Sequence, residues 1–539
     1  MEFSVADVHE AIAATRPDTD CLVFRDRRLT WADVTERTRR LANHLIGAGL
    51  GVHVERSHLA GHESGQDHLA IYLHNGNEYL ESMLGAFKAR VAPFNVNYRY
   101  VAEELRYLLE DSRAVAIVIH SQFAPTLAEV LPQLDDLRVI LQVPDDSGNE
   151  LLPGAVWYED ALASASPDKP AVEWSADDLY ILYTGGTTGM PKGVLWRNGD
   201  ANVECFGGSK ADTVEAVIAA ADGSLKALLA PPFMHGAGHW MTFYTWNLGG
   251  TVYIQSLPDR LEPSDVWGLV EREQLNFLLI VGDAFGRPLL DELSARSYDL
   301  RSLTVLLSGG AALSAGLKDE FLAHLPSLII VDGLGSSEAG GQLTHVSAGS
   351  GATTGTFAIS PGNHVLSADL DRELQPGDEE LGWLAKSGRL ALGYLGDEAK
   401  TARAYPVIDG VRYAVPGDRA RLREDSVVEL HGRDSVTINS GGEKIFAEEV
   451  EAALKAHPDV YDCVVAGRPS DRWGNEVIAV VRMRDGRAAD EVSLLAEAQR
   501  HIARYKLPKA FVFVDEVVRS PSGKADYRWA KQVAASPSP

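Results

Sequence analysis

Apolar residues along the chain alternate between two patterns. In residues 79–87 they recur with helical spacing, so that one side of the segment is apolar. Elsewhere they form short continuous runs, which are typical of strands buried on both faces. Strand–helix alternation predicts an α/β fold with layered, mostly parallel sheets. Runs of the strand type stand at residues 69–73, 114–119, 137–143, 180–183, 277–281, 303–307 and 328–331.

The pattern changes near Arg433. The remaining stretch of about 105 residues suits a small α+β domain. We therefore predict a large N-terminal domain of residues 1–433, a small C-terminal domain of residues 434–535 and a disordered Ser/Pro tail at 536–539. Within the small domain we expect helices at 447–456 and 492–505 and strands at 463–466, 477–483 and 511–514.

Composition narrows the class of protein. The chain has 539 residues, and single cores stop growing at roughly 250–300 residues, so at least two domains are expected. Acidic residues number 76 and basic residues 50, a net charge of −26 that argues against non-specific binding to nucleic acid. There are three cysteines, Cys21, Cys205 and Cys463; they are far apart with no metal-ligand spacing, and no disulfide framework is implied. Without a secretory signal or an apolar run of about 18 residues, a cytoplasmic protein with no transmembrane segment is expected.

The strand-like run at 180–183 leads into a loop rich in glycine and threonine. Four glycines allow the backbone amides to approach a ligand closely, and successive amides form an anion-binding nest. Threonine hydroxyls and a lysine add donors and positive charge. The register fits neither G-x-x-x-x-G-K-[ST] nor G-x-G-x-x-G. The loop is therefore predicted to cradle phosphates, through Thr184, Gly185, Gly186, Thr187, Thr188, Gly189 and Lys192.

This loop resembles the signature of the adenylate-forming superfamily, which comprises acyl-CoA synthetases, adenylation domains of peptide synthetases and beetle luciferases. Further segments resemble the family in the same order over nearly the whole chain. The resemblance implies ATP, Mg²⁺ and coenzyme A as cofactors. It also implies a reaction in which a carboxylate attacks ATP to give acyl-AMP and pyrophosphate, and a thiol then takes the acyl group.

Two loops resemble the segments that hold the nucleotide. The loop at 307–312 implies that Gly309, Gly310 and Ala311 line the adenine and acyl pockets. The segment 332–338 resembles the family's G-Y-G-x-T-E pattern and implies nucleotide contacts for Asp332, Gly333, Leu334 and Ser337, with Glu338 as the Mg²⁺ ligand. An oxygen ligand suits Mg²⁺, which is a hard cation. In this segment Leu334 replaces the aromatic residue that stacks on adenine, and Ser337 replaces a threonine.

The ribose, catalytic and hinge residues are implied by later segments. Asp418 and Arg433 resemble the pair that binds the ribose, and Lys524 resembles the catalytic lysine between carboxylate and α-phosphate. Ser435 stands at the pivot position, which places the hinge near residues 434–436, and a small residue can absorb the change in φ and ψ. After rotation, Gly441 and Gly442 are implied to line the pantetheine tunnel. The predicted catalytic set is Lys524, Glu338 and Thr184.

The segment 231–240 resembles the border of the acid pocket. His235 fits an aromatic gate, Gly236 leaves space, and Trp240 supplies apolar wall; Gly310 and Gly335 complete the predicted substrate set. The segment has no aspartate to pair with an α-amine, which argues against an amino-acid substrate. Residues 233–240 and 440–446 most resemble acyl-CoA synthetases that act on fatty acids or steroid side-chain acids. We therefore expect a fatty, steroid side-chain or other apolar acid.

Three alternatives stay open. An acyl-AMP ligase would load a carrier protein instead of coenzyme A, and a luciferase-like oxygenase would consume oxygen. A non-catalytic nucleotide-binding protein would need neither Lys524 nor Glu338, and both are present. The expected partners are a carboxylic acid, ATP and coenzyme A, and the resemblance leaves a homodimer open.

Overall fold

The computed structural model describes residues 2–184, 190–208, 210, 211, 213–440, 443–470 and 473–535, and for residue 435 the backbone alone. The predicted phosphate-loop residues 185–189, the predicted tunnel residues Gly441 and Gly442, and the tail 536–539 lie outside this part of the chain. We call residues 434–535, which follow the predicted boundary, the C-terminal unit.

The first sheet is parallel from β8 to β7 and ends in an antiparallel pair at the β8 side. Its β8 is the predicted strand before the phosphate loop, and β3 matches the run predicted at 69–73 within one residue. Across the sheet the strands are β19 (Gly393–Tyr394), β9 (Lys192–Arg197), β8 (Leu179–Thr184), β4 (Ala92–Asn95), β3 (His68–Tyr72), β5 (Ala114–His120), β6 (Val139–Val143) and β7 (Val156–Trp157).

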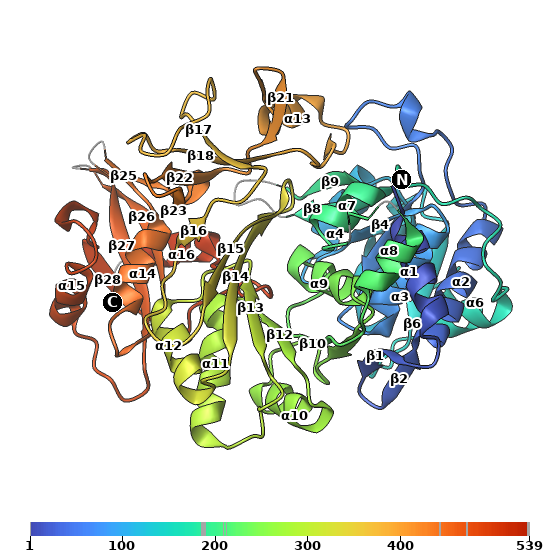
Figure 1. Ribbon diagram of the computed structural model, residues 1–539, viewed down its shortest axis with the longest axis horizontal. Coiled ribbons are helices and arrows are strands. Elements are labelled where there is room, and N and C mark those ends of the chain that lie inside the picture. The colour runs from blue at the N-terminus through green and yellow to red at the C-terminus, as the bar shows by residue number, and fades with distance from the viewer. Residues whose placement is uncertain are drawn as a thin grey trace.

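The second sheet is parallel over its six central strands and antiparallel at both edges. The alternation of strands and helices in the sequence thus predicted the layered, mostly parallel architecture of these two sheets, which lie side by side in Figure 1. The strands of the second sheet, in order across it, are β15 (Gly340–Ser347), β14 (Ile329–Ser336), β13 (Val305–Gly309), β12 (Phe277–Ile280), β10 (Lys226–Leu229), β11 (Thr251–Ile254), β1 (Asp20–Phe24) and β2 (Arg27–Thr30).

Helices pack against both sheets, and the largest apolar core includes side chains from α1, α2, α3 and α9. A capping box at Thr30 and Asp33 starts α2, because each side chain accepts the other residue's backbone amide. In the described part of the chain before the C-terminal unit, the helices are α1 (Val5–Thr15), α2 (Trp31–Gly47), α3 (Asn77–Lys88), α4 (Ala102–Asp111), α5 (Ala124–Val130), α6 (Tyr158–Ser164), α7 (Asn198–Glu204), α8 (Val214–Ala220), α9 (Gly236–Asn247), α10 (Pro263–Glu273), α11 (Gly282–Ala295), α12 (Ala315–His324) and α13 (Glu398–Ala404).

A third sheet is antiparallel, and the sequence patterns did not predict it. Its strands mix polar and charged residues with apolar ones, so that they lack the continuous apolar runs of the parallel sheets. They are β16 (Thr356–Ala358), β23 (Val427–Arg433), β22 (Asp418–Leu422), β18 (Gly382–Ser387), β21 (Val411–Ala414) and β20 (Val407–Ile408), with β17 (Asn363–Leu366) beside β18.

The C-terminal unit has its own sheet and core. The helix predicted at 492–505 ends at residue 498. A continuous helix would point Ile502 and Leu507 about 140° apart, whereas both side chains enter the same core. The elements are β24 (Ile438–Ser440), β25 (Glu443–Ile445), α14 (Ala447–Lys455), β26 (Val460–Ser470), β27 (Gly474–Met483), α15 (Glu491–Ala498), β28 (Ala510–Phe513) and α16 (Tyr527–Ala535).

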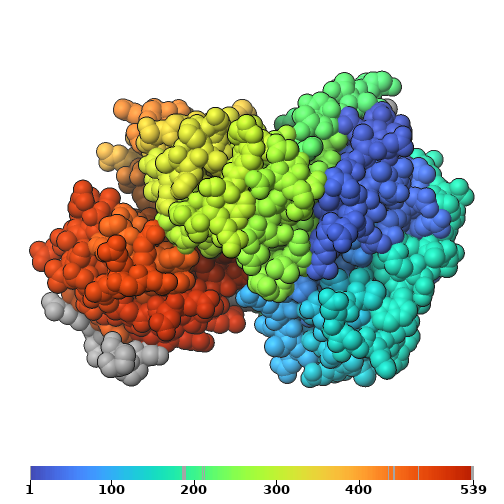
Figure 2. Space-filling view, turned by 90° about the horizontal axis from the view of Figure 1, so that it is seen from below, coloured from blue at the N-terminus to red at the C-terminus, as the bar shows by residue number. Residues whose placement is uncertain are grey.

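The C-terminal unit lies against α11 and α12 (Figure 1). Figure 2 shows a notch between this unit, in red, and the first third of the chain, in blue and cyan. Among the described helices, none combines the length and apolar character that crossing a membrane requires.

Candidate active site

The turn that carries Lys524 is built to dock on the N-terminal part of the chain. The guanidinium of Arg519 donates two 2.7 Å hydrogen bonds to Asp462, which fixes the start of the turn. Gly523 has φ +71, and a Cβ added to it would lie 3.2 Å from both the Val281 carbonyl oxygen and the Ala284 Cβ. Glycine is therefore required twice, for the left-handed backbone and for the close approach to α11.

Lys524 lies among the predicted nucleotide-binding residues. A Cβ added to Gly310, in the loop after β13, would be 3.6 Å from the Lys524 Cε. Burial among protein atoms, and then the charge of Arg433, lower the pKa of Lys524 to about 8, while Glu338 and Asp418 act against this shift. Lys524 is nevertheless exposed to solvent, so neighbouring protein atoms surround the ammonium without sealing it off. The fold thus brings together a turn, a loop and two charged strands that are distant in sequence.

The predicted ribose pair forms across two neighbouring strands. Asp418 on β22 lies opposite Arg433 on β23, and the Arg433 Nε donates to Asp418 Oδ1 at 3.2 Å. The negative charge of Asp418 is the main reason why the pKa of Arg433 is raised. Asp418 is buried, and its negative charge acts on the nearby Lys524 ammonium.

Glu338 is held by two tyrosines that the sequence analysis did not single out. Tyr394 Oη donates to Glu338 Oε1 at 2.8 Å, and Tyr405 Oη donates to the Glu338 carbonyl oxygen at 3.3 Å. The Lys192 ammonium lies 5.3 Å from the centre of the Tyr394 ring. Burial and the charge of Lys400 lower the pKa of Lys192. The Gly-Tyr-Leu-Gly context at 393–396, just before a helix, was the signal available for Tyr394.

The loops after β13 and β14 are fixed by buried polar contacts. Ser308 Oγ accepts a hydrogen bond from the Gly282 amide at 3.0 Å, and Gly310 adopts φ +85. The Asp332 carboxylate pairs with the fully buried Lys318 ammonium, whose Nζ also donates to the Thr353 carbonyl oxygen at 2.6 Å. One oxygen of the Asp332 carboxylate is thus already paired with Lys318, and the residue lies within β14, between Ser308 on β13 and His345 on β15.

Leu334, which is predicted to lie beside the adenine, packs against other apolar side chains. It is half-buried against an apolar cluster and pairs in register with Leu343 on β15. The next segment is also anchored, because the fully buried Trp196 indole donates to the Ser337 carbonyl oxygen at 2.8 Å. Gly333 and Gly335 flank Leu334 on β14.

Two asparagines tie the predicted acid-pocket segment to the first sheet. Asn75 exchanges hydrogen bonds with that segment, donating to the Pro231 carbonyl oxygen and accepting from the Phe233 amide. Asn95, at the end of β4, donates to the carbonyl oxygens of Tyr183 and Met234, at 2.8 and 2.7 Å. The Asn95 side chain therefore holds both Tyr183, just before the predicted phosphate loop, and Met234, just before His235.

His235 faces the lysine from the other side of the cleft. Burial, and then the charge of Lys524, lower the pKa of His235 to about 3, so the imidazole is neutral. Its buried Nε2 has no hydrogen-bond partner within the described residues. Gly236 starts α9, and Trp240 lies one turn further along the helix. This arrangement leaves a neutral aromatic ring and an apolar wall opposite a lysine.

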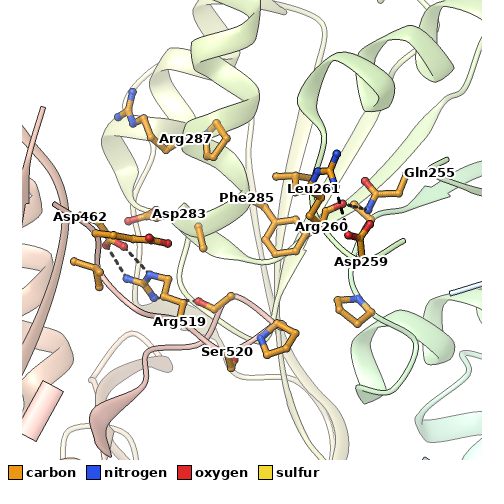
Figure 3. A pocket seen from close by; sticks show the side chains of 18 of the residues that line it. Gln255, Asp259, Arg260, Leu261, Asp283, Phe285, Arg287, Asp462, Arg519 and Ser520 are labelled. Atoms are coloured by element: carbon orange, nitrogen blue, oxygen red, sulfur yellow. Dashed lines mark hydrogen bonds and ion pairs between the residues drawn. The ribbon is translucent and has the colours of Figure 1, made fainter. Parts of the chain in front are cut away.

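A cavity of about 320 Å³ opens beside the Lys524 turn (Figure 3). Phe285 and Asp283 of α11 line one side, and Arg519 and Ser520 of the C-terminal unit line the other. Two polar contacts span the boundary nearby. The Lys455 ammonium lies 3.4 Å from Asp283 Oδ2, and Tyr461 Oη lies 3.3 Å from Asp291 Oδ2. Closing of the C-terminal unit on α11 thus buries complementary charges.

The described residues contain no cluster of three side chains that could hold a metal ion. Glu338 nevertheless fits Mg²⁺, since this ion usually takes one or two carboxylates and completes its shell with phosphates and water. One Glu338 oxygen accepts from Tyr394, which orients the carboxylate toward the cleft.

The chain is similar to known proteins over nearly its whole length. The model of the AMP-binding enzyme family matches residues 9–395, and that of the AMP-binding enzyme C-terminal domain matches residues 449–524. The medium-chain acyl-CoA ligase Mig of Mycobacterium avium is 52% identical over 99% of this chain and 98% of its own length. A medium/long-chain fatty acid and 3-oxocholest-4-en-26-oate CoA ligase of Mycolicibacterium smegmatis is 41% identical over 99% and 97%.

Solved structures show the same fold. ATP-bound MatB from Rhodopseudomonas palustris superposes with a TM-score of 0.80 at 22% identity, covering 98% of this chain and 99% of its own. The anthranilate CoA ligase AuaEII in complex with anthranoyl-AMP gives a TM-score of 0.82 at 19% identity, covering 99% and 97%. With both family models matched in order, the chain belongs to the AMP-binding enzyme family.

Proposed function

We propose that the protein is an AMP-forming acid:CoA ligase that activates an apolar carboxylic acid and transfers it to coenzyme A. One observation carries the proposal. The Lys524 side chain enters the cleft formed by Gly310, Arg433 and Glu338, where an acid and the phosphates of ATP would meet. The likeness to ligases along the full length of the chain supports the same assignment.

Adenylate formation is an electrostatic problem, because a carboxylate must approach a polyanion. The acid oxygen attacks the α-phosphorus, the bond to the β-phosphate breaks, and pyrophosphate leaves with the electron pair. Lys524 would lie between the carboxylate and the α-phosphate and neutralise charge that develops there. Arg433 and Asp418 would hold the ribose, and Lys192 and the residues 184–189 the outer phosphates. Mg²⁺, when bound by Glu338, would neutralise phosphate charge.

We assign the acid to the apolar class. The cleft wall at His235 is neutral and Trp240 is apolar, so no group in this described segment would pair with a charged substituent. The names of the two curated relatives, which act on medium-chain, long-chain and steroid side-chain acids, point to the same class. Gly236 and Gly335 would leave space beside the carboxylate.

We propose that the second half-reaction follows a rotation of the C-terminal unit about Ser435. Rotation would withdraw Lys524 and present Gly441 and Gly442 to the pantetheine arm. The thiol sulfur would then attack the adenylate carbonyl, lose its proton to solvent and expel AMP. The backbone around Ser435 forms a single 3-10 turn between β23 and β24, which is a short connection suited to a pivot.

The location proposed for the enzyme is the cytoplasm. All three cysteines are buried and unpaired, as expected in a reducing compartment.

The proposal is tested by incubating the protein with ATP, Mg²⁺ and single acids, with or without coenzyme A. Pyrophosphate release with an apolar acid, and thioester formation only when coenzyme A is added, are the expected results. Thioester on a phosphopantetheinyl carrier protein but none on coenzyme A would instead identify an acyl-AMP ligase.

A further inference from the structure

A chain of hydrogen bonds links β8 to α9 beneath the predicted acid pocket. Trp240 Nε1 donates to the Tyr180 hydroxyl at 2.9 Å, and the Tyr180 hydroxyl meets His239 Nε2. The other ring nitrogen of His239, Nδ1, lies 2.6 Å from the Phe233 carbonyl oxygen. Tyr180 stands four residues before Thr184, so the chain joins the strand that leads to the phosphate loop with the helix that follows His235.

The direction of each hydrogen bond follows from its ends. A carbonyl oxygen only accepts, so His239 Nδ1 carries the proton that bonds to Phe233. Burial lowers the pKa of His239 to about 4, which leaves Nε2 without a proton and able to accept. The Tyr180 hydroxyl must therefore donate to His239 and accept from Trp240. Within this series of hydrogen bonds, the Tyr180 hydroxyl is bonded both to the Trp240 indole and to the His239 ring.

The Trp240 indole is also confined on a second side. A Cβ added to Gly236 would lie 3.1 Å from Trp240 Cε2 and 3.3 Å from Leu182 Cδ2. The indole thus lies against the bare backbone of Gly236, while its Nε1 is tied to Tyr180. Contact on one face and a hydrogen bond at one edge together select a single orientation of the ring.

The Trp240 indole lies at the edge of the packed core. Trp240 is half-buried, whereas Tyr180 and His239 are each 1% exposed. Behind them Phe206 stacks on Phe243, with ring centres 4.7 Å apart. An acid that starts at Lys524 and runs along α9 would therefore reach the Trp240 ring before any of these core residues.

We propose that Tyr180 is a positioning residue that holds Trp240 as the end wall of the acid pocket, and that it thereby sets the longest acid the enzyme accepts. The inference rests on the proposed ligase function and adds a determinant of chain length to it. When the Tyr180 hydroxyl is removed, the indole loses its tether and is no longer held in one orientation, so that longer acids can pass the end wall.

The test compares Tyr180→Phe, Trp240→Phe and the double variant with wild type over straight-chain acids from hexanoate to hexadecanoate. Either single substitution removes the same hydrogen bond. We expect each to raise the ratio of kcat/KM for long over short acids about tenfold, which is the effect of one buried hydrogen bond. Because the two residues act through one bond, the double variant should match the singles rather than multiply them.

Tyr72→Phe is the matched control. Tyr72 is as buried as Tyr180 and lies in the same sheet on β3, but it packs in a different core, against Phe123. The Tyr72→Phe substitution also removes a buried hydroxyl, but it should leave the chain-length profile unchanged. If Tyr180→Phe does not fold, Trp240→Phe removes the same bond from the half-buried side and carries the test.

Unchanged profiles in both single variants would overturn the inference, and so would effects that multiply in the double variant. A Tyr72→Phe profile shifted as far as that of Tyr180→Phe would also overturn it, since general loosening would then be the cause. In each of these cases wild-type protein still ligates acids, so the proposed function survives. Wild type that forms no thioester with any acid would overturn both.

Discussion

The ammonium of Lys524 is the side-chain group on which the proposed adenylation most directly depends. It lies near Arg433, Glu338 and Asp418, so the surrounding charges have both signs. Protonation of the lysine adds a positive charge and makes the binding of an anion more favourable. His235, across the cleft, is neutral and adds no competing charge. A carboxylate that enters here meets the Lys524 ammonium, which forms no ion pair with an acidic side chain among the described residues.

Lys524→Ala should lower the rate of adenylate formation by about a hundredfold or more, because preorganised charge at a reacting phosphate is worth that much. Thioester formation from supplied acyl-AMP should persist, since that step follows withdrawal of the lysine. Pyrophosphate release and acyl-AMP consumption measure the two steps separately. Lys531→Ala, at an exposed lysine on α16, is the control. Loss of both steps alike in Lys524→Ala would remove the assigned role.

The pH dependence of adenylation should show the titration of Lys524. Its pKa is lowered to about 8, so the charged form is present below that pH and is lost as pH rises through it. The rate of pyrophosphate release should therefore fall on the alkaline side of about pH 8. Lys524→Arg keeps its charge to higher pH and should move this decline upward. A rate that stays level to pH 10 in the wild-type enzyme would contradict the assignment.

Single residues also show where sequence reasoning stops. The Lys524 turn, the Asp418 and Arg433 pair and Glu338 each stand in recognisable motifs, and the fold brings them into one cleft. Asn95 could not be found in this way, because an asparagine after a strand is an ordinary turn residue. Its significance depends on two carbonyl groups, of Tyr183 and Met234, that only the tertiary structure places beside it.

Among the structural elements, strands that read as continuous apolar runs were predictable, and those of the third sheet were not. The predicted strands include the antiparallel β26 and β27 of the C-terminal unit. Buried strands such as β3 and β12 read as continuous apolar runs, which a sequence displays directly. Strands of the third sheet, such as β22 and β18, mix charged and polar residues with apolar ones and show no such run. The end of α15 was misplaced because core packing, rather than local propensity, decides where the chain leaves the helix.

The turn before Lys524 offers a test at this scale. Gly523→Ala should reduce adenylation by about tenfold or more, since a Cβ would press on Val281 and Ala284 and push the turn away from α11. Gly486→Ala is a matched control, because Gly486 has φ +74 but nothing within 4 Å of an added Cβ. Both variants carry the strain of a left-handed alanine, about 1–2 kcal/mol of unfolding free energy. Equal pyrophosphate-release rates in the two variants would show that docking of the turn is not needed.

In the molecule as a whole, the mechanism that we propose requires the C-terminal unit to close for one half-reaction and to turn away for the other. The ion pair between Lys455 and Asp283 joins it to α11 in the closed arrangement, while Lys455 keeps a second acid, Asp462, within its own unit. Losing the pair on rotation therefore leaves the lysine with one partner. The closed arrangement is favoured without being locked.

Asp283→Asn should weaken this closed arrangement. The substitution removes the charge facing Lys455 but keeps an oxygen to accept the Ser314 amide, which Asp283 Oδ1 binds at 2.7 Å. We expect adenylation to fall about threefold to tenfold, in line with 0.5–1.5 kcal/mol for a partly buried pair, and thioester formation from acyl-AMP to hold or rise. Asp459→Asn removes an ion pair within the C-terminal unit and is the control. Equal losses in both half-reactions would argue against a role in closure.

Ligase activity itself is tested most directly by pyrophosphate release from ATP over acids of graded length, followed with and without coenzyme A. We predict release with apolar acids, an acyl-AMP that accumulates when coenzyme A is absent, and its conversion to thioester and AMP when coenzyme A is added. ATP left intact with every acid, in protein shown to be folded, would contradict the account.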